Sequence, residues 1–189
     1  MPTEDRRKAY QYFLECFQIA TTKIPDQYIH LPIAGSELSV YRERVYCYEL
    51  YHQLKLAMVN DYGYSLGGEV DKIGHPLFQG PTLRRAKPDL LVHKPGDMEG
   101  NLVVVEIKPI VANSKGIKKD LRSLTAFKRE ARYYQSIYLV YGDSEETFQI
   151  FRTKAFNAQT GDPEQIDIGV IALYWHRYSG QPAKKIKWR

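Results

Sequence analysis

Three charged side chains stand in a segment that otherwise has the composition of buried sheet. Asp89, Glu106 and Lys108 lie within KPDLLVHKPGDMEGNLVVVEIKP, residues 87–109. Burying a charge is unfavourable unless the charge is paired or binds an ion. Mg²⁺ binds proteins through one or two carboxylates, and a nearby lysine can orient or deprotonate a water on such an ion. These residue types therefore indicate metal-assisted hydrolysis of a phosphate ester.

The turn between the two strands determines which of these side chains meet. Pro95, Gly96 and Gly100 mark this turn and predict antiparallel pairing. Because the turn lies midway between positions 89 and 106, a symmetric hairpin places Asp89 opposite Glu106, with Cβ atoms ~5 Å apart. Their repulsion is roughly 3 kcal/mol at an effective dielectric of ~20, so one carboxylate is protonated or a cation lies between them. A bulge that slips the pairing by one residue would turn Asp89 to the other face.

The second strand is apolar on both faces until its last residues. Such a strand is covered on both sides, and it ends at the sheet's edge, where Pro109 stops the ladder. The alternation of side chains predicts one face with Leu102, Val104, Glu106 and Lys108 and another with Val103, Val105 and Ile107.

The residues Pro88-Asp89 and Glu106-Ile107-Lys108 resemble the motif of the PD-(D/E)xK nuclease superfamily, whose members include restriction endonucleases and recombination nucleases. The resemblance implies an α/β, restriction-endonuclease-like fold: a mixed central sheet flanked by helices, here with an N-terminal helical extension. It implies that Asp89, Glu106 and the Ile107 carbonyl bind Mg²⁺, for which Mn²⁺ can substitute. It also implies that Lys108 activates the attacking water.

Members of that superfamily often add a glutamate from an earlier helix. The helix expected over residues 41–60 contains Glu43 and Glu49. Glu49 lies about 50° from the centre of the helix's inner face and Glu43 about 70°. Glu49 is therefore preferred as the acid that holds a metal-bound water or a second cation. An ordinary surface ion pair at helical spacing is the alternative for Glu49.

Basic residues on either side of these strands are candidates for phosphate contacts. Arg84, Arg85 and Lys87 immediately precede Asp89. The helix expected over residues 115–135 carries a stripe of five cations, with acids missing from it: Lys115, Lys118, Arg122, Arg129 and Arg132. The stripe fits either a nucleic-acid backbone or an ordinary solvated face.

Two further polar residues of this helix, Asp120 and Lys128, fall near its apolar arc. The superfamily often places an auxiliary polar residue there. For Asp120 we favour the structural interpretation, a local ion pair.

The order of elements predicts a mixed sheet with helices on its faces. We expect residues 1–40 to be a helix and connection packed on the core, residues 41–180 to be the nuclease-like domain, and residues 181–189 to be a mobile basic tail. The expected helices cover residues 3–20, 41–60, 115–135 and 145–157, and the expected strands cover residues 64–70, 88–93, 102–108, 136–142 and 168–177.

The composition is that of a soluble globular protein of one domain. The 189 residues are 43% hydrophobic and 26% charged, and no uncharged apolar run approaches the ~18 residues of a membrane span. Residues 1–13 do not read as a secretion signal, so a cytoplasmic location is expected. Cys16 and Cys47 lack disulfide or zinc spacing, and the net charge of +5 permits a polyanionic partner.

Together these features predict a Mg²⁺-dependent endonuclease that acts on DNA. One alternative is a nuclease-like subunit that binds nucleic acid or supports assembly with little cleavage of its own, and another is a nuclease acting on RNA. A homodimer or a larger complex is an expected partner arrangement. A role in bacterial defence or mobile-element processing follows from the resemblance alone.

Overall fold

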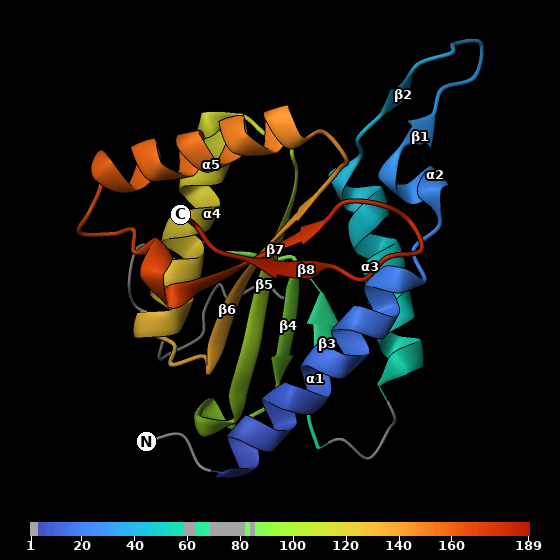
Figure 1. Cartoon of the computed structure of the whole chain (residues 1–189). Helices are drawn as coiled ribbons and strands as arrows, with labels where there is room; N and C mark the ends of the chain where they lie inside the picture. Colours follow the sequence, from blue (N-terminus) through green and yellow to red (C-terminus); the bar gives the residue numbers. More distant parts are fainter. Residues whose placement is uncertain (1–3, 59–62, 69–81, 84–85) are drawn as a thin grey trace.

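The structure is a computed structural model that describes residues 4–58, 63–68, 82–83 and 86–189. A mixed sheet forms its centre, with helices on both faces (Figure 1). Its six strands lie in the order β3 (Ser65–Gly68), β4 (Leu90–His93), β5 (Asn101–Pro109), β6 (Gln135–Tyr141), β7 (Ile171–His176) and β8 (Lys184–Ile186). The pairs β5–β6 and β6–β7 are parallel and the other neighbouring pairs are antiparallel. The predicted α/β class with a mixed sheet is confirmed.

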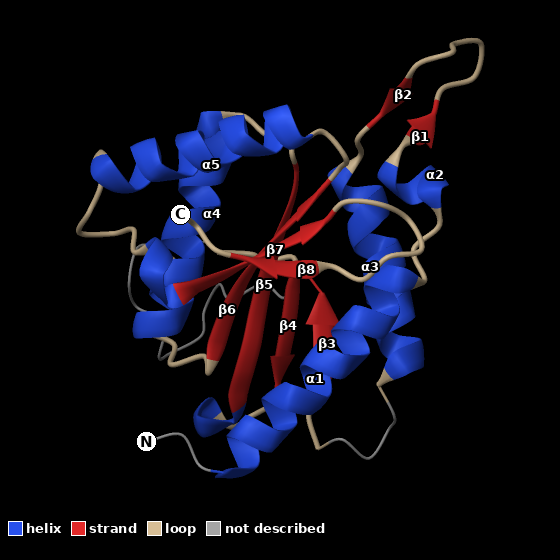
Figure 2. Ribbon diagram, viewed as in Figure 1, coloured by secondary structure: helices blue, strands red, loops and turns tan. Residues whose placement is uncertain are grey.

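Two helices cover each face of the sheet. One face carries α1 (Glu4–Thr22) and α3 (Glu43–Ala57), and the other carries α4 (Ser114–Arg129) and α5 (Glu145–Thr160). The connection predicted between the first two long helices contains α2 (Asp26–Ile29) and a short hairpin of β1 (Leu31–Pro32) and β2 (Ser39–Val40), which projects from the body (Figure 2). Two short 3-10 helices, η2 (Met98–Gly100) and η3 (Ile168–Val170), precede β5 and β7.

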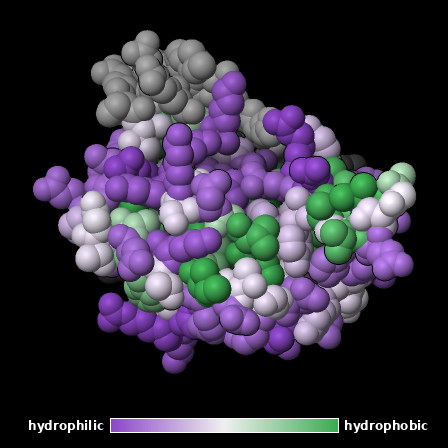
Figure 3. All heavy atoms as spheres, turned by 90° about the horizontal axis from the view of Figure 1, so that it is seen from above, coloured by the Kyte–Doolittle hydropathy of each residue, from purple (hydrophilic) through white to green (hydrophobic). Residues whose placement is uncertain are grey.

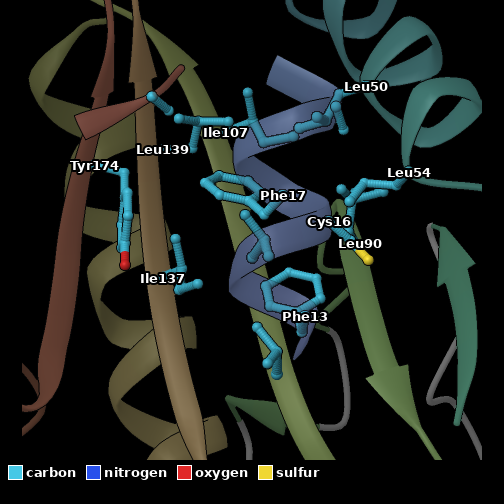
Figure 4. Packing of buried hydrophobic residues seen from close by; sticks show 14 of the residues in the cluster. Phe13, Cys16, Phe17, Leu50, Leu54, Leu90, Ile107, Ile137, Leu139 and Tyr174 are labelled. Carbon is cyan, nitrogen blue, oxygen red and sulfur yellow. The ribbon is translucent and has the colours of Figure 1, made fainter. Parts of the chain in front are cut away.

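The core on the α1 side is built from large apolar side chains. Phe17 of α1 lies beside Ile107 and Leu139 of the sheet, Phe13 lies about one turn away on the same helix, and Leu50 of α3 closes the layer (Figure 4). All five are fully buried. The side chains of α1 recur at helical spacing, so the helix can turn one apolar stripe to the sheet.

The register predicted for the β4–β5 hairpin is confirmed. Leu90 pairs with Val105, and continuing this register by one residue brings Asp89 opposite Glu106. A bulge does occur, but it lies next to His93 at the turn end of the hairpin. The pairing is therefore regular at the end of the hairpin that carries Asp89 and Glu106, and Asp89 is not turned to the other face.

The predicted alternation along β5 is confirmed apart from one residue. Val103, Val105 and Ile107 belong to the core under α1 and α3, and Val104 belongs to the core under α4 and α5. Leu102, predicted on the face of Val104, packs into the core under α1 and α3 instead. It lies beside the hairpin's bulge, where the regular alternation of faces is disturbed.

The helix predicted over residues 115–135 ends earlier, at Arg129. The chain then turns, and Arg132 adopts a positive φ of 55°, which is incompatible with a right-handed α-helix. Within the described residues, no helix is long and apolar enough to cross a membrane.

The C-terminal residues differ from the predicted mobile tail. Residues Lys184–Ile186 form β8, the outer strand of the sheet next to β7. The indole N–H of Trp188 donates to the carbonyl of Ile171 at 2.8 Å, and its ring lies 6.5 Å from that of Tyr138, centroid to centroid. An aromatic residue and a strand pairing thus anchor this segment despite its basic composition.

The end of the sheet also reaches the first helix. The hydroxyl of Thr21, at the end of α1, accepts a hydrogen bond from the backbone N–H of Ala183, just before β8, at 3.0 Å. The rings of Phe17 and Tyr174 meet edge to face at 5.4 Å. The N-terminal helix is therefore part of the same packed unit as the last strands.

Replacing Trp188 by Ala should lower the free energy of unfolding by about 2 kcal/mol, because a half-buried ring and its hydrogen bond are lost. The exposed neighbour Lys187 serves as the control, since Lys187→Ala should change stability by less than ~0.5 kcal/mol. Urea unfolding measures both. Equal midpoints for the two variants would mean that the segment is a free tail.

Candidate active site

Five charged side chains come together where β5 ends. Asp89 precedes β4, Glu106 and Lys108 lie on β5, Glu43 begins α3, and Asp120 lies in the middle of α4. We call these five residues the charged cluster. Helices from both faces of the sheet contribute to it, so its geometry depends on the packing of both layers.

Lys108 is the centre of the charged cluster. Its Nζ donates to Oε1 of Glu43 at 2.6 Å and lies 3.3 Å from Oδ2 of Asp120. The hydroxyl of Tyr138 donates to the same oxygen of Asp120 at 3.1 Å. Burial lowers the pKa of Lys108, but Asp120, Glu43 and Asp89 outweigh it and raise this pKa above its ordinary value. Lys108 is thus held as an ammonium group.

Asp89 is held against the backbone of the facing strand. Its Oδ2 accepts a hydrogen bond from the N–H of Ile107 at 2.7 Å. Burial raises the pKa of Asp89 to about 7, although that hydrogen bond and the charge of Lys108 oppose the shift. Near neutral pH this carboxyl is therefore poised between its two protonation states.

Glu106 is more deeply buried than its position near a strand end suggests. The residue is 5% exposed, and its Oε1 accepts a hydrogen bond from the hydroxyl of Ser123 on α4 at 3.0 Å. Burial, followed by the charges of Asp120 and Asp89, raises the pKa of Glu106 well above its ordinary value. The predicted electrostatic conflict between the facing carboxylates is present.

The helical acid differs from the one preferred from the sequence. Glu43 contacts Lys108, whereas Oε1 of Glu49 accepts a hydrogen bond from Gln53 on the next turn of α3. The angular criterion misled because it ranks faces of a helix and says nothing of height along its axis. Glu43 stands in the first turn of α3, level with the end of β5, and Glu49 lies further along the helix.

A cleft of about 620 Å³ opens beside Glu106, between α4 and the residues that lead into β4. Glu106 is the single acid among the described residues that line the cleft, and five cations line it: Lys87, Lys115, Lys118, Lys119 and Arg122. The molecule seen from above shows hydrophilic side chains over most of the described surface, with apolar patches among them (Figure 3). Such a cleft suits an anion such as a phosphate. A larger hollow of about 820 Å³ lies along β7 and β8 and includes none of the charged cluster.

The stripe of cations predicted on α4 is partly neutralised. Arg122 pairs with Asp162, which also lies 3.7 Å from Lys118, and Arg129 pairs with Asp167 at 2.6 Å. These acids follow α5, some forty positions along the chain from their partners, so inspection of the helix alone could not find them.

Of the other residues predicted to contact phosphates, some line the cleft and some lie away from it. Lys87 and Lys115 line the cleft. Arg132 lies beyond the end of α4 and approaches Glu99 at 3.9 Å, with both side chains 79% exposed. Arg84 and Arg85 lie outside the described residues. The cleft therefore uses the first half of the stripe, and Arg129 and Arg132 lie apart from it.

Sequence reasoning gave too little weight to the residues behind the charged cluster. Asp120 does form an ion pair, but its partner is Lys108 on β5, and the residue is 2% exposed. Ser123 and Tyr138 were not singled out at all. The available signal was an acid between Ile117 and Leu121, on the buried arc of the helix, where an acid needs a strong partner.

The charged cluster can be compared with what Mg²⁺ requires. Within residues 4–58, 63–68, 82–83 and 86–189, no three His, Cys, Asp or Glu side chains converge into a metal-binding group. Mg²⁺ does not require such a cage, because it uses one or two carboxylates and keeps several waters. Asp89 and Glu106 fit this requirement as a pair whose mutual repulsion a cation would relieve. The role of the Ile107 carbonyl as a third ligand stays a prediction.

Replacing Asp89 by Asn should make the metal-free protein less sensitive to pH. Because folding raises the pKa of Asp89 from 3.8 to about 7, the folded state binds this proton more tightly than the unfolded state. The wild type should therefore lose stability, relative to Asp89→Asn, as the pH rises from ~4 to ~7. Melting temperatures in EDTA measure this. The control is Glu164→Gln, at an exposed acid after α5, and a parallel pH profile for all three proteins would contradict the prediction.

The function of this protein has to be inferred from its own residues, because comparison with known proteins gives no match. No protein-family model, curated protein or solved structure matches the chain. The sheet with its flanking helices is therefore described as a mixed α/β fold. The likeness of its strand residues to the PD-(D/E)xK motif stays a prediction.

Proposed function

We propose that this protein is a metal-dependent nuclease of the PD-(D/E)xK type, which hydrolyses phosphodiester bonds of DNA. The observation that carries the proposal is the meeting of Asp89, Glu106 and Lys108 at the end of β5, beside a cleft lined with cations. A binding surface for phosphates alone would gain nothing from buried carboxylates, because they repel a phosphate backbone.

The order of elements supports the fold part of the proposal. The segment from α3 through β3, β4, β5 and α4 to β6 gives a helix, three strands, a helix and a strand. The resemblance to the PD-(D/E)xK superfamily implies a core with this same order of elements. Asp89 immediately precedes the second of these strands and Glu106 lies on the third, in agreement with the order in the motif.

Each residue of the site has a distinct task in the proposed reaction. Lys87, Lys115 and Lys119 would bind phosphates of the substrate strand in the cleft. Lys108, as an ammonium group, would orient the attacking water and balance charge that develops on the phosphate. Mg²⁺ or Mn²⁺, held by Asp89 and Glu106, would supply Lewis acidity and lower the pKa of a bound water.

A second candidate is a DNA-binding or assembly subunit with little cleavage of its own. The ion pairs of Lys108 favour it, because Glu43 and Asp120 already engage two of the three N–H donors of this lysine and offset its charge. In this case the basic cleft would bind DNA in a salt-dependent manner without metal-dependent cleavage. A role in bacterial defence or mobile-element processing is compatible with either candidate.

The test is cleavage of supercoiled, linear and single-stranded DNA, and of RNA, with Mg²⁺, Mn²⁺ or EDTA. We expect cleavage of DNA that EDTA abolishes, and a loss of at least ~100-fold in rate for Asp89→Asn and for Lys108→Ala. The exposed strand residue Lys184 provides a control, since Lys184→Ala should retain full activity. Equal rates for wild type and both site variants would refute the nuclease, and faster cleavage of RNA would change its substrate.

The two helical acids give a matched pair of variants. Glu43→Gln should lower the rate of cleavage by ~10-fold or more, because Glu43 positions Lys108 and removal of such supporting contacts typically has this effect. Glu49→Gln should leave the rate within ~2-fold of the wild type, because Glu49 contacts Gln53. Rates are measured at saturating DNA. The reverse result would restore Glu49 as the helical acid of the site.

A further inference from the structure

An aromatic pocket lies on the other face of the sheet from the basic cleft. It has a volume of about 290 Å³ and is lined by six residues: Cys47, Tyr48, Tyr51, Gly68, Asp89 and Leu90. The cleft includes Glu106 and lies against α4, whereas the aromatic pocket includes Asp89 and lies against α3. Glu106 therefore borders the basic cleft, and Asp89, which faces it across the hairpin, borders the aromatic pocket.

The lining of the aromatic pocket suits a flat, uncharged group. Tyr48 and Tyr51 are three residues apart on α3, so their rings lie on the same side of the helix. Tyr48 is 62% exposed, so a ligand can reach its ring from solvent. Asp89 is the single charged residue among the described residues of the lining. The volume is near the lower end of ligand pockets, ~300 Å³, and fits one planar ring system.

Gly68 leaves the wall of this pocket open. A Cβ atom placed on Gly68 would lie 3.5 Å from the carbonyl oxygen of Asp89 and 3.7 Å from the ring of Tyr51, which is ordinary contact. The hydroxyl of Tyr51 donates a long hydrogen bond, 3.5 Å, to the carbonyl of Leu66 on the same strand as Gly68. A side chain at position 68 would therefore enter the pocket without displacing the charged cluster.

We propose that the aromatic pocket holds one unpaired nucleobase of the strand whose phosphate lies at the charged cluster. This inference rests on the proposed function and names its substrate class: single-stranded DNA, or DNA with an unpaired base beside the cleaved bond. Bases stack readily on tyrosine rings, whatever their sequence. In an intact duplex the bases are paired and stacked, so a base reaches the pocket only after it leaves the stack.

Binding tests the inference without any need for cleavage. The probes are a fluorescent thymidine oligonucleotide of about 12 nucleotides and an abasic oligonucleotide of equal length, with titration in EDTA followed by anisotropy. The wild type should bind the thymidine probe ~10-fold more tightly than the abasic probe. Tyr48→Ala should abolish this difference by weakening the thymidine complex alone, and Tyr48→Phe, which keeps the ring, should restore it.

Two further variants separate base binding from general damage. Gly68→Leu, which fills the pocket, should weaken the thymidine complex and spare the abasic complex. Tyr178→Ala removes an exposed tyrosine from the loop between β7 and β8 and should change neither complex. The inference is overturned if the wild type binds both probes equally, or if Tyr48→Ala weakens both or neither.

Cleavage data distinguish failure of this inference from failure of the proposed function. If base-dependent binding occurs without metal-dependent cleavage, the base-binding pocket is supported and the nuclease function is refuted. If the wild type cleaves duplex DNA as fast as single-stranded DNA and Tyr48→Ala has no effect on either rate, the nuclease function is supported and the base-binding pocket is refuted. Under the proposal, Tyr48→Ala raises KM for single-stranded DNA by ~10-fold with little change in kcat.

Discussion

The ion pairs of Lys108 connect the three layers of the molecule. One ammonium group on the central strand meets Glu43 from the helix on one face and Asp120 from the helix on the other. Asp89 and Glu106 stand beside it, so four acids share one lysine in a largely buried region. This imbalance opposes folding and favours any cation that can enter. The apolar layers above and below the sheet must supply the stability that the charged cluster lacks.

Those layers also explain why the site can be rigid. The residues of β5 before Glu106 are buried, and each face of the strand packs against its own pair of helices. A strand held on both faces cannot shift its register without exposing one core. The positions of Asp89 and Glu106 therefore stay opposite one another across the hairpin.

The sequence was informative where the determinant was local. The turn at residues 95–100 and the alternation of β5 determined the hairpin register, and with it the meeting of Asp89 and Glu106. Prediction from the sequence failed where the interaction partner of a residue lies far away along the chain. Helical angles could not show which turn of α3 is level with the end of β5, and the acids that neutralise Arg122 and Arg129 follow a later helix. The last strand was missed because its lysines resemble those of a solvated tail, while Trp188 provides the anchor.

The contact between α1 and the last strands has a consequence for folding during synthesis. Phe17 of the first helix packs against the ring of Tyr174, and Thr21 accepts a hydrogen bond from Ala183. The ribosome adds both of these partners more than 150 positions later. Contacts so distant in sequence form slowly and late. An emerging chain would hold α1 against an unfinished sheet, and the pairing of β7 with β8 would complete the unit. A partly made chain would thus lack the completed sheet that positions the charged cluster, and this cluster would take its final geometry only when the last strand is in place.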